Sequence, residues 1–267
     1  MPARKKKTSP KKKPAKASVA SLKEYQAKRN FAVSPEPSGA APAKSPKGRE
    51  LFFCVQKHWA SHLHYDFRLE WNGVLLSWAV PKGPSLQPRD KRLAMKVEDH
   101  PFDYGEFEGV IPEGYGAGVV MLWDKGTWHA ESEDTAAALA KGELKFTLNG
   151  VKLKGSWVLV RTGPTDSRTW LLIKHRDTWS GDVDIATFAP NSVKSDGSFK
   201  AILTSHAPEF WNSNRNQEKV PGAQLQKVIE KILAEDSPKT AATSRAQART
   251  RKPRGSIRAK SAAPIHP

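Results

Sequence analysis

Residues 63–70 alternate strictly between apolar and polar side chains, and this pattern restricts the segment to a β-strand. The apolar positions are Leu63, Tyr65, Phe67 and Leu69, and the polar positions are His64, Asp66, Arg68 and Glu70. Successive side chains of a strand point to opposite faces of a sheet. We therefore predict a strand with one packed apolar face and one face that carries a row of ionisable groups.

Strand signals recur at short intervals as far as residue 175. We expect strands at residues 51–56, 63–71, 74–80, 93–97, 119–123, 127–130, 144–148, 152–161 and 170–175. Turns are expected at Asn72-Gly73, Lys125-Gly126 and Asn149-Gly150. Helices are expected at residues 21–29, 134–141, 197–212 and 222–235. Many antiparallel strands with few helices favour an all-β, mainly antiparallel fold, either a sandwich or a small barrel.

Bulky and sulfur-containing residues are interpreted as packing residues. We expect Trp78, Trp123, Trp157 and Trp170 in the core or at its rim. Cys54 lies in the apolar run at residues 51–55, which is typical of a buried, inert thiol. The apolar stripe of residues 222–235 suits a helix that docks on the barrel.

The formal charge of +17 is concentrated at the two ends of the chain. Residues 1–50 hold 14 Lys and Arg against 3 acidic residues, and residues 237–267 hold 8 against none, whereas residues 51–236 hold 22 against 24. We expect residues 1–20 and 237–267 to be disordered basic arms that contact phosphate backbones or keep the chain in solution. Between them we expect a short helix and Pro/Gly-rich linker (21–49), the β-structure (50–190) and C-terminal helices (191–236). Because no segment approaches 18 apolar residues and no secretion signal is present, we expect a cytoplasmic, nucleoid-associated protein without a membrane partner.

The polar row of residues 63–70 predicts a metal site beside a phosphate. Two imidazoles and a carboxylate, from His58, His64 and Asp66, form a donor set that suits Mn, Fe or Zn. Arg68, on the same face, offers a planar fork for phosphate oxygens. The local pattern fits equally well a set of hydrogen-bonded core residues with a surface ion pair.

A second polar cluster lies at residues 92–104. Arg92 and Glu98 share a strand face with Lys96, and a turn after them carries His100 and Tyr104. A histidine beside a metal-bound phosphate can protonate the leaving oxygen. Lys82 offers a further point charge. Each of these residues alone also fits a structural role, but together they favour metal-assisted phosphoester hydrolysis.

Two glycine-containing motifs are interpreted as turns. Residues 113–118 resemble a tight turn or bulge more than a nucleotide loop, because no helix signal follows them. Residues 194–197 match the short Lys-x-Asp-Gly signature of nucleotidyltransferase ligases, but only 70 residues follow Gly197, too few for an adenylation domain. We therefore interpret residues 196–197 as a turn and helix start.

Several collinear motifs resemble the 3′-phosphoesterase domain of bacterial DNA ligase D. They are residues 56–58, 63–70, 77–85, 97–101, 107–112 and 170–174, and the resemblance covers about residues 25–180. It implies a compact β-barrel with short flanking helices, in agreement with the strand count.

The resemblance also implies an activity and roles for individual residues. His58, His64 and Asp66 would bind Mn²⁺, with other divalent transition metals as alternatives. Arg68, His100 and Tyr104 would surround the scissile phosphate, supported by Gln56, Lys82, Arg92 and Glu98. The implied enzyme trims a 3′-terminal ribonucleotide from a DNA primer–template and removes the remaining 3′-phosphate, which leaves a 3′-hydroxyl for end joining. We expect a monomer that serves a separate ligase and an end-binding protein.

The sequence departs from the family pattern in three places. Arg29 is followed by Asn30, where the family often has an arginine–aspartate pair. The glycine-rich turn is one residue shorter between Gly114 and Tyr115, and the polymerase and ligase domains are missing, as expected of a stand-alone version. A non-catalytic DNA-binding or end-joining scaffold that retains the barrel is therefore the competing class of function, although the retained metal and phosphate residues argue against loss of activity.

Overall fold

A computed structural model describes residues 22–39, 50–206 and 222–235 of the 267-residue chain. The chain divides into two compact units, Met1–Ile229 and Glu230–Pro267, and the described part of the second unit is the C-terminal end of one helix. The basic arms expected at residues 1–20 and 237–267 lie outside the described residues.

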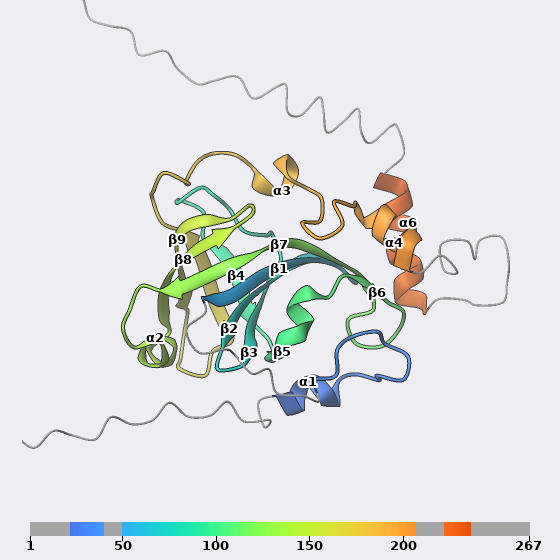
Figure 1. The fold of residues 1–267 in the computed structure, drawn as a ribbon, viewed down its shortest axis with the longest axis horizontal. Coiled ribbons are helices and arrows are strands. Elements are labelled where there is room, and N and C mark those ends of the chain that lie inside the picture. Colours follow the sequence, from blue (N-terminus) through green and yellow to red (C-terminus); the bar gives the residue numbers. More distant parts are fainter. Residues whose placement is uncertain (1–21, 40–49, 207–221, 236–267) are drawn as a thin grey trace, which may run out of the picture. The chain divides into compact units, whose positions relative to one another are not determined.

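The first unit is built around a closed antiparallel β-barrel (Figure 1). Its eight strands follow the order β1, β2, β3, β4, β10, β9, β8 and β7, and β7 pairs again with β1. They are β1 (Leu51–Trp59), β2 (Leu63–Trp71), β3 (Val74–Val80), β4 (Arg92–Lys96), β7 (Gly118–Ala130), β8 (Glu143–Gly150), β9 (Lys154–Arg161) and β10 (Thr169–Lys174). Because every strand has two neighbours, the ring leaves no open edge. The predicted all-β, mainly antiparallel barrel is confirmed.

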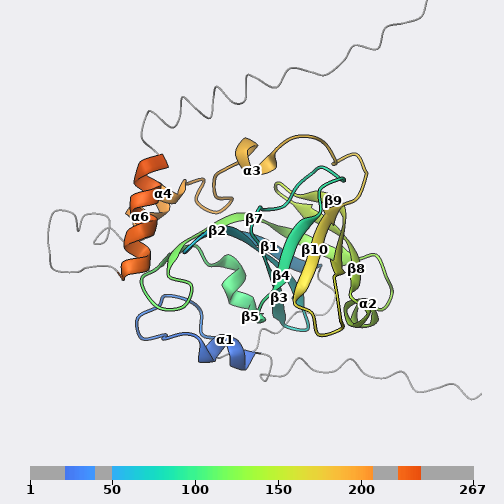
Figure 2. The ribbon, with the colours of Figure 1, turned by 180° about the vertical axis from the view of Figure 1, so that it is seen from behind.

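Short elements flank the barrel (Figure 2). Strand β5 (His100–Pro101) pairs with β3, strand β6 (Gly109–Ile111) pairs with β7, and the 3-10 helix η2 (Phe102–Glu106) connects them. The α-helices are α1 (Lys23–Ala27), α2 (Thr135–Lys141), α3 (Ile185–Phe188), α4 (Phe199–His206) and α6 (Ala223–Glu235). Within the described residues, no helix is both long and apolar enough to cross a membrane.

Local sequence signals set the ends of several elements. Asp134 begins α2, because its Oδ1 accepts the N–H of Ala137 at 2.9 Å, and Gly142 ends the helix with φ 85°. Asn72 (φ 51°) and Gly73 (φ 81°) are both left-handed, which is the backbone of a type I′ hairpin turn between β2 and β3. These predictions from capping and turn residues are confirmed.

The turn predicted at Lys125-Gly126 is wrong. Strand β7 runs without a break through both residues, so the two strands predicted at 119–123 and 127–130 are one. Gly126 is needed for a close approach, because a Cβ there would lie 2.1 Å from the carbonyl oxygen of Asn149 in β8. The turn predicted at Asn149-Gly150 comes slightly later. Both residues still belong to β8 and pair with β7, and the N–H of Gly150 donates to the carbonyl of Leu153 at 2.9 Å. The helix predicted at residues 197–212 corresponds to α4, which runs from Phe199 to His206. Residues 207–212 lie outside the described residues.

The barrel interior is apolar, and this places the polar row of β2 on the outer face. Phe67 of β2 and Phe146 of β8 lie on strands that do not pair, yet their ring centroids are 5.9 Å apart. The odd-numbered side chains of β2 therefore point into the barrel, and the even-numbered ones point outward. The tryptophans expected to pack are buried, and burial raises the pKa of the Cys54 thiol to about 12.

The outer face of β1, β2 and β3 is itself covered. A cluster of Tyr25, Leu75 and Tyr104 joins the N-terminal segment, β3 and η2 over this face, with Phe31, Phe52, Phe102 and Phe107 packed around it. Residues 22–39, which the sequence places before the barrel as a helix and linker, thus pack against it. Arg68 and Glu70 are consequently almost completely buried, although they point away from the barrel core.

Candidate metal and phosphate site

A cavity of about 330 Å³ lies on this covered outer face, and we call it the site cavity. Its lining combines β1 and β2 with residues 22–39, residues 97–104 and the glycine-rich loop 113–117. The polar side chains that line it are Arg29, Glu36, Ser61, His58, His64, Asp66, Arg68, Glu98, His100, Tyr104, Tyr115 and Gln224.

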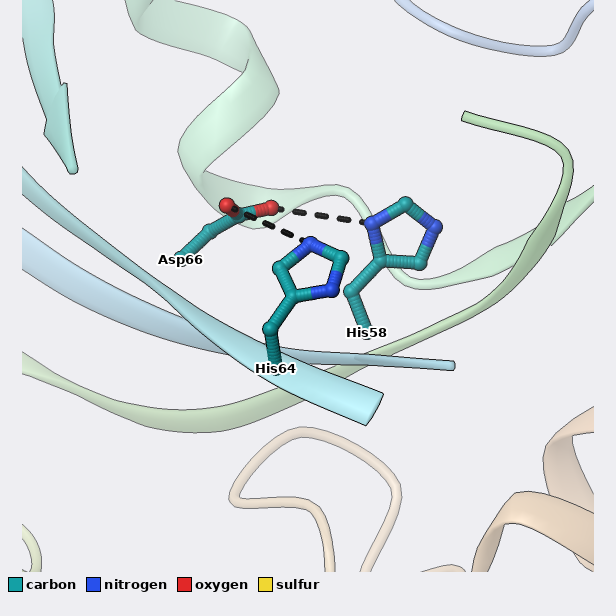
Figure 3. A group of neighbouring side chains, drawn as sticks. All are labelled: His58, His64 and Asp66. Carbon is teal, nitrogen blue, oxygen red and sulfur yellow. Dashed lines mark ion pairs between the residues drawn. The ribbon is translucent and has the colours of Figure 1, made fainter. Parts of the chain in front are cut away.

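His58, His64 and Asp66 converge in the site cavity (Figure 3). The antiparallel register of β1 and β2 places His58 directly opposite His64, and Asp66 follows two residues later on the same face. His58 Nδ1 lies 3.7 Å from Asp66 Oδ2, and His64 Nε2 lies 3.7 Å from Asp66 Oδ1. One possible ligand atom from each residue lies within 4.8 Å of the other two, which is close enough to share a metal ion.

Backbone carbonyls orient both imidazoles. The Nε2 of His58 is 2.9 Å from the carbonyl oxygen of Gly116, and the Nδ1 of His64 is 2.9 Å from that of His62. Since a carbonyl only accepts, these nitrogens are the donors, and His58 Nδ1 and His64 Nε2 are left facing Asp66. Metal-binding histidines characteristically donate their second N–H to a carbonyl or carboxylate in this way. The donor set therefore fits a divalent transition metal.

Arg68 is fixed beside this donor set by three acceptors. Its Nε donates to Gln56 Oε1 at 2.7 Å, one terminal nitrogen donates to Ser77 Oγ at 2.8 Å, and the other donates to Asp66 Oδ2 at 3.0 Å. Gln56 is oriented in turn, because its amide donates to the carbonyls of Tyr104 and Phe107, both at 2.9 Å. A guanidinium held in this way presents a fixed positive charge to the cavity.

Electrostatics keep Asp66 and His64 in the protonation states that a metal requires. Burial opposes the charge on Asp66, but the guanidinium of Arg68 and the imidazole of His58 hold its pKa well below the usual range. Burial lowers the pKa of His64, so the imidazole is neutral at neutral pH. An ionised carboxylate and a neutral imidazole are the forms that bind metal ions.

His100 also lines the cavity, as a neutral imidazole. Its Nδ1 donates to the carbonyl of Glu98 at 2.9 Å, and its Nε2 accepts from Arg29, 3.2 Å away, since a guanidinium only donates. Burial, with the charges of Arg68 and Arg29, lowers the pKa of His100 well below its usual value. Tyr104 packs edge-on against His100, with ring centroids 4.8 Å apart, and burial raises its pKa well above the usual value.

The N-terminal segment supplies charged residues that the sequence analysis missed as site residues. Arg29 donates to Glu36 at 2.9 Å and to Glu98 at 3.2 Å, and all three side chains are almost completely buried. Lys28 donates to the other oxygen of Glu98 at 3.1 Å. Burial raises the pKa of Glu98, but the hydrogen bond from its own backbone N–H, together with those from Lys28 and Arg29, outweighs this effect and lowers the pKa. Arg29 ends the segment predicted as a helix and Glu36 lies between two prolines, and no periodic pattern marks either of them as a site residue.

The structure brings together most, but not all, of the residues expected at the site. His58, His64, Asp66, Arg68, Glu98, His100 and Tyr104 line the cavity, and Gln56 lies directly behind Arg68. Lys82 and Arg92 do not line it: Lys82 is exposed in the turn after β3, and Arg92 pairs with Asp90 at 2.9 Å. The glycine-rich loop is a tight turn, as expected, with Ala117 N–H donating to the Gly114 carbonyl at 3.3 Å.

Comparison with known proteins returns one family and a consistent set of relatives. Residues 56–161 match the family model described as "DNA Ligase D 3'-phosphoesterase domain". The chain is 50% identical over 190 residues to the Multifunctional non-homologous end joining protein LigD of Pseudomonas aeruginosa, an alignment that covers 69% of this chain and 22% of the relative.

Two mycobacterial relatives give the same result. The protein of the same name from Mycolicibacterium smegmatis is 39% identical over 163 residues, which cover 58% of this chain and 21% of the relative. The Multifunctional non-homologous end joining DNA repair protein LigD of Mycobacterium tuberculosis is 42% identical over 144 residues, which cover 53% and 18%. The alignments thus span about a fifth of the length of these curated relatives.

Proposed function

The chain carries a DNA ligase D 3′-phosphoesterase domain, and from this premise we propose that it is a metal-dependent phosphoesterase that processes the 3′ ends of DNA. The proposed substrates are primer–template ends that terminate in a ribonucleotide or a phosphate. The proposed product is a 3′-hydroxyl ready for ligation in DNA repair by end joining.

The observation that carries this proposal is the orientation of the three metal-binding candidates. His58 Nδ1, His64 Nε2 and the Asp66 carboxylate face one another, and both imidazoles donate their other N–H to a carbonyl. If these residues had only a structural role, His58 Nδ1 and His64 Nε2 would be expected to form short hydrogen bonds with neighbouring side chains, but each lies 3.7 Å from Asp66. Mn²⁺ is the proposed ion, and other divalent transition metals share its preference for these ligands.

The remaining residues of the cavity have proposed roles that follow from their chemistry. A bound divalent ion would polarise a phosphoryl oxygen as a Lewis acid. Arg68 uses three of its five N–H groups within the protein, so its remaining N–H groups can donate to phosphate oxygens. His100 and Tyr104, which also line the cavity, are proposed to contact the same phosphate.

Other residues are proposed to act indirectly. Gln56 and Glu98 are positioning residues for Arg68 and for the Arg29–His100 pair. Lys82 and Arg92 are proposed to support a bound strand outside the cavity. The basic arms at 1–20 and 237–267 are proposed to hold the DNA backbone. A separate ligase and an end-binding protein are the proposed partners of a monomer.

The test is a cleavage assay on a primer–template that ends in a 3′-ribonucleotide or a 3′-phosphate. We expect hydrolysis that requires a divalent metal and that is abolished by His64→Ala. In a series of Mn²⁺, Zn²⁺ and Mg²⁺, the rate is expected to be highest with Mn²⁺. Hydrolysis that survived His64→Ala would refute the metal assignment. DNA binding without any hydrolysis by the full chain would instead support a non-catalytic scaffold.

A further inference from the structure

Tyr115 is an exposed aromatic residue at the mouth of the site cavity. It is 52% exposed and lines the cavity from the glycine-rich loop, next to the residue that orients His58. An exposed aromatic side chain is not informative by itself. Tyr115 lines the same cavity as the proposed metal-binding residues, so a substrate bound there could contact its ring.

Two side chains anchor the backbone of the loop that carries Tyr115. Gly116 accepts from His58 Nε2 at 2.9 Å, and Ala117 accepts from the amide of Gln224 at 2.7 Å through their carbonyl oxygens. Gly114 and Gly116 both adopt φ 82°, which permits the tight turn that these contacts fix. A Cβ at Gly114 would meet no atom within 4 Å, so this glycine is required for its backbone conformation and not for space. The ring of Tyr115 is thus carried by a turn whose next two carbonyls are hydrogen-bonded to the rest of the domain.

Two cations flank the ring. The Lys28 ammonium lies 5.0 Å and the Arg29 guanidinium 5.6 Å from the ring centroid of Tyr115. Lys28 retains 30% side-chain exposure, while Arg29 reaches into the cavity towards His100. Both cations are also paired with carboxylates: Lys28 lies 2.8 Å from Glu24 and 3.1 Å from Glu98, and Arg29 pairs with Glu36 and Glu98. The mouth of the cavity therefore offers a half-exposed aromatic ring held among balanced charges. A nucleobase has the flat aromatic surface that stacks on such a ring.

We propose that Tyr115 is a stacking platform for a nucleobase at the 3′ end of the bound DNA strand. This inference rests on the proposed function, because it assumes that the scissile phosphate occupies the site cavity. Tyr115 then acts as a positioning residue that selects nucleic-acid ends over small phosphoesters. The base that stacks is either that of the terminal nucleotide or that of its 5′ neighbour.

The test compares Tyr115→Ala and Tyr115→Phe with a matched control. Trp179→Ala is suitable, because Trp179 is 53% exposed, lies 4.9 Å from the Lys154 ammonium and does not line the site cavity. Loss of one stacked base is expected to weaken binding and to raise KM for a DNA end roughly 5- to 100-fold. Tyr115→Phe keeps the ring and is expected to stay within about twofold of the wild type. Glycerol 2-phosphate has no aromatic ring that could stack. Its cleavage is expected to be unchanged in Trp179→Ala and to fall less in Tyr115→Ala than cleavage of the DNA end does.

A second readout is independent of catalysis. 2-Aminopurine is placed at the terminal nucleotide in one substrate and at its 5′ neighbour in another. We expect its fluorescence to be quenched on binding at one of these positions, and the quenching to be lost in Tyr115→Ala but kept in Tyr115→Phe. The position that responds identifies the stacked base.

Each unfavourable outcome has a definite meaning. Stacking is overturned if Tyr115→Ala changes binding and quenching no more than Trp179→Ala, or if Tyr115→Phe loses as much as Tyr115→Ala. Tyr115→Leu, which keeps the bulk without an aromatic face, replaces Tyr115→Ala if circular dichroism shows that variant to be misfolded. Absence of metal-dependent hydrolysis by the wild type would refute the proposed function, whereas the fluorescence result would still decide the stacking.

Discussion

Replacing Arg68 by methionine is expected to destabilise the metal-free protein strongly. The guanidinium is 1% exposed and donates to Asp66, Gln56 and Ser77 at 2.7–3.0 Å. Without it, the buried Asp66 carboxylate loses its cationic partner and keeps only the imidazoles, 3.7 Å away. Removing one partner of a buried ion pair typically costs about 3–5 kcal/mol, which is a large part of the stability of a single domain.

The assay is urea unfolding at pH 7.5 in EDTA, so that metal binding adds no stability to the folded state. Arg92→Met is the matched control, because Arg92 pairs with Asp90 at 2.9 Å but keeps 27% side-chain exposure. We expect that substitution to lower the free energy of unfolding by about 1 kcal/mol or less.

A double-mutant cycle identifies the cause of the loss. In an Asp66→Asn background, no buried carboxylate remains to be stranded, so Arg68→Met should cost about 1–3 kcal/mol less than in the wild type. Additive losses, or a loss for Arg68→Met no larger than for Arg92→Met, would refute the interpretation that Arg68 neutralises a buried Asp66.

Three further predictions concern other parts of the molecule. His100 is buried with a pKa well below that of an unfolded histidine, so only the unfolded chain gains its proton as the pH falls below about 6.5; the free energy of unfolding should therefore fall between pH 7.5 and 5.5, and His100→Gln should lack that component in unfolding titrations. Gly126→Ala should lower the free energy of unfolding by about 1–3 kcal/mol, because its Cβ would lie 2.1 Å from the Asn149 carbonyl oxygen; an unchanged urea midpoint would contradict the close approach of β7 and β8. Deleting residues 1–20 and 238–267 should weaken DNA binding and flatten its salt dependence while sparing hydrolysis of a small phosphoester, and an unchanged affinity would exclude the arms from the interface.

Much of the barrel follows from local patterns in the sequence. The alternation in residues 63–70 and the Asn72-Gly73 turn lead directly to β2 and its hairpin with β3, because both depend on neighbouring residues alone. At Gly126, local patterns led to a wrong prediction, because β7 continues where a turn was expected. A glycine in a turn and a glycine at a close approach of two strands look alike in a sequence, and only the pairing of β7 with β8 distinguishes them.

The site was partly predictable for the same reason. His64, Asp66 and Arg68 share one strand face, and His58 joins them because the hairpin register brings β1 opposite β2. Arg29 could not be placed, because its contacts with Glu98 and His100 span about 70 residues of sequence and depend on how the N-terminal segment packs over the barrel. That the polar row lies outside the barrel core, under this segment, likewise required the tertiary structure.

The central claim is that His58, His64 and Asp66 hold one metal ion beside Arg68. Anomalous diffraction from crystals of the full chain grown with Mn²⁺ tests it most directly. We expect a single strong peak in the anomalous difference map, within bonding distance of His58 Nδ1, His64 Nε2 and the Asp66 carboxylate. Crystals of Asp66→Asn should show no peak at this position. A manganese peak elsewhere in the chain, with these three side chains unliganded, would contradict the account.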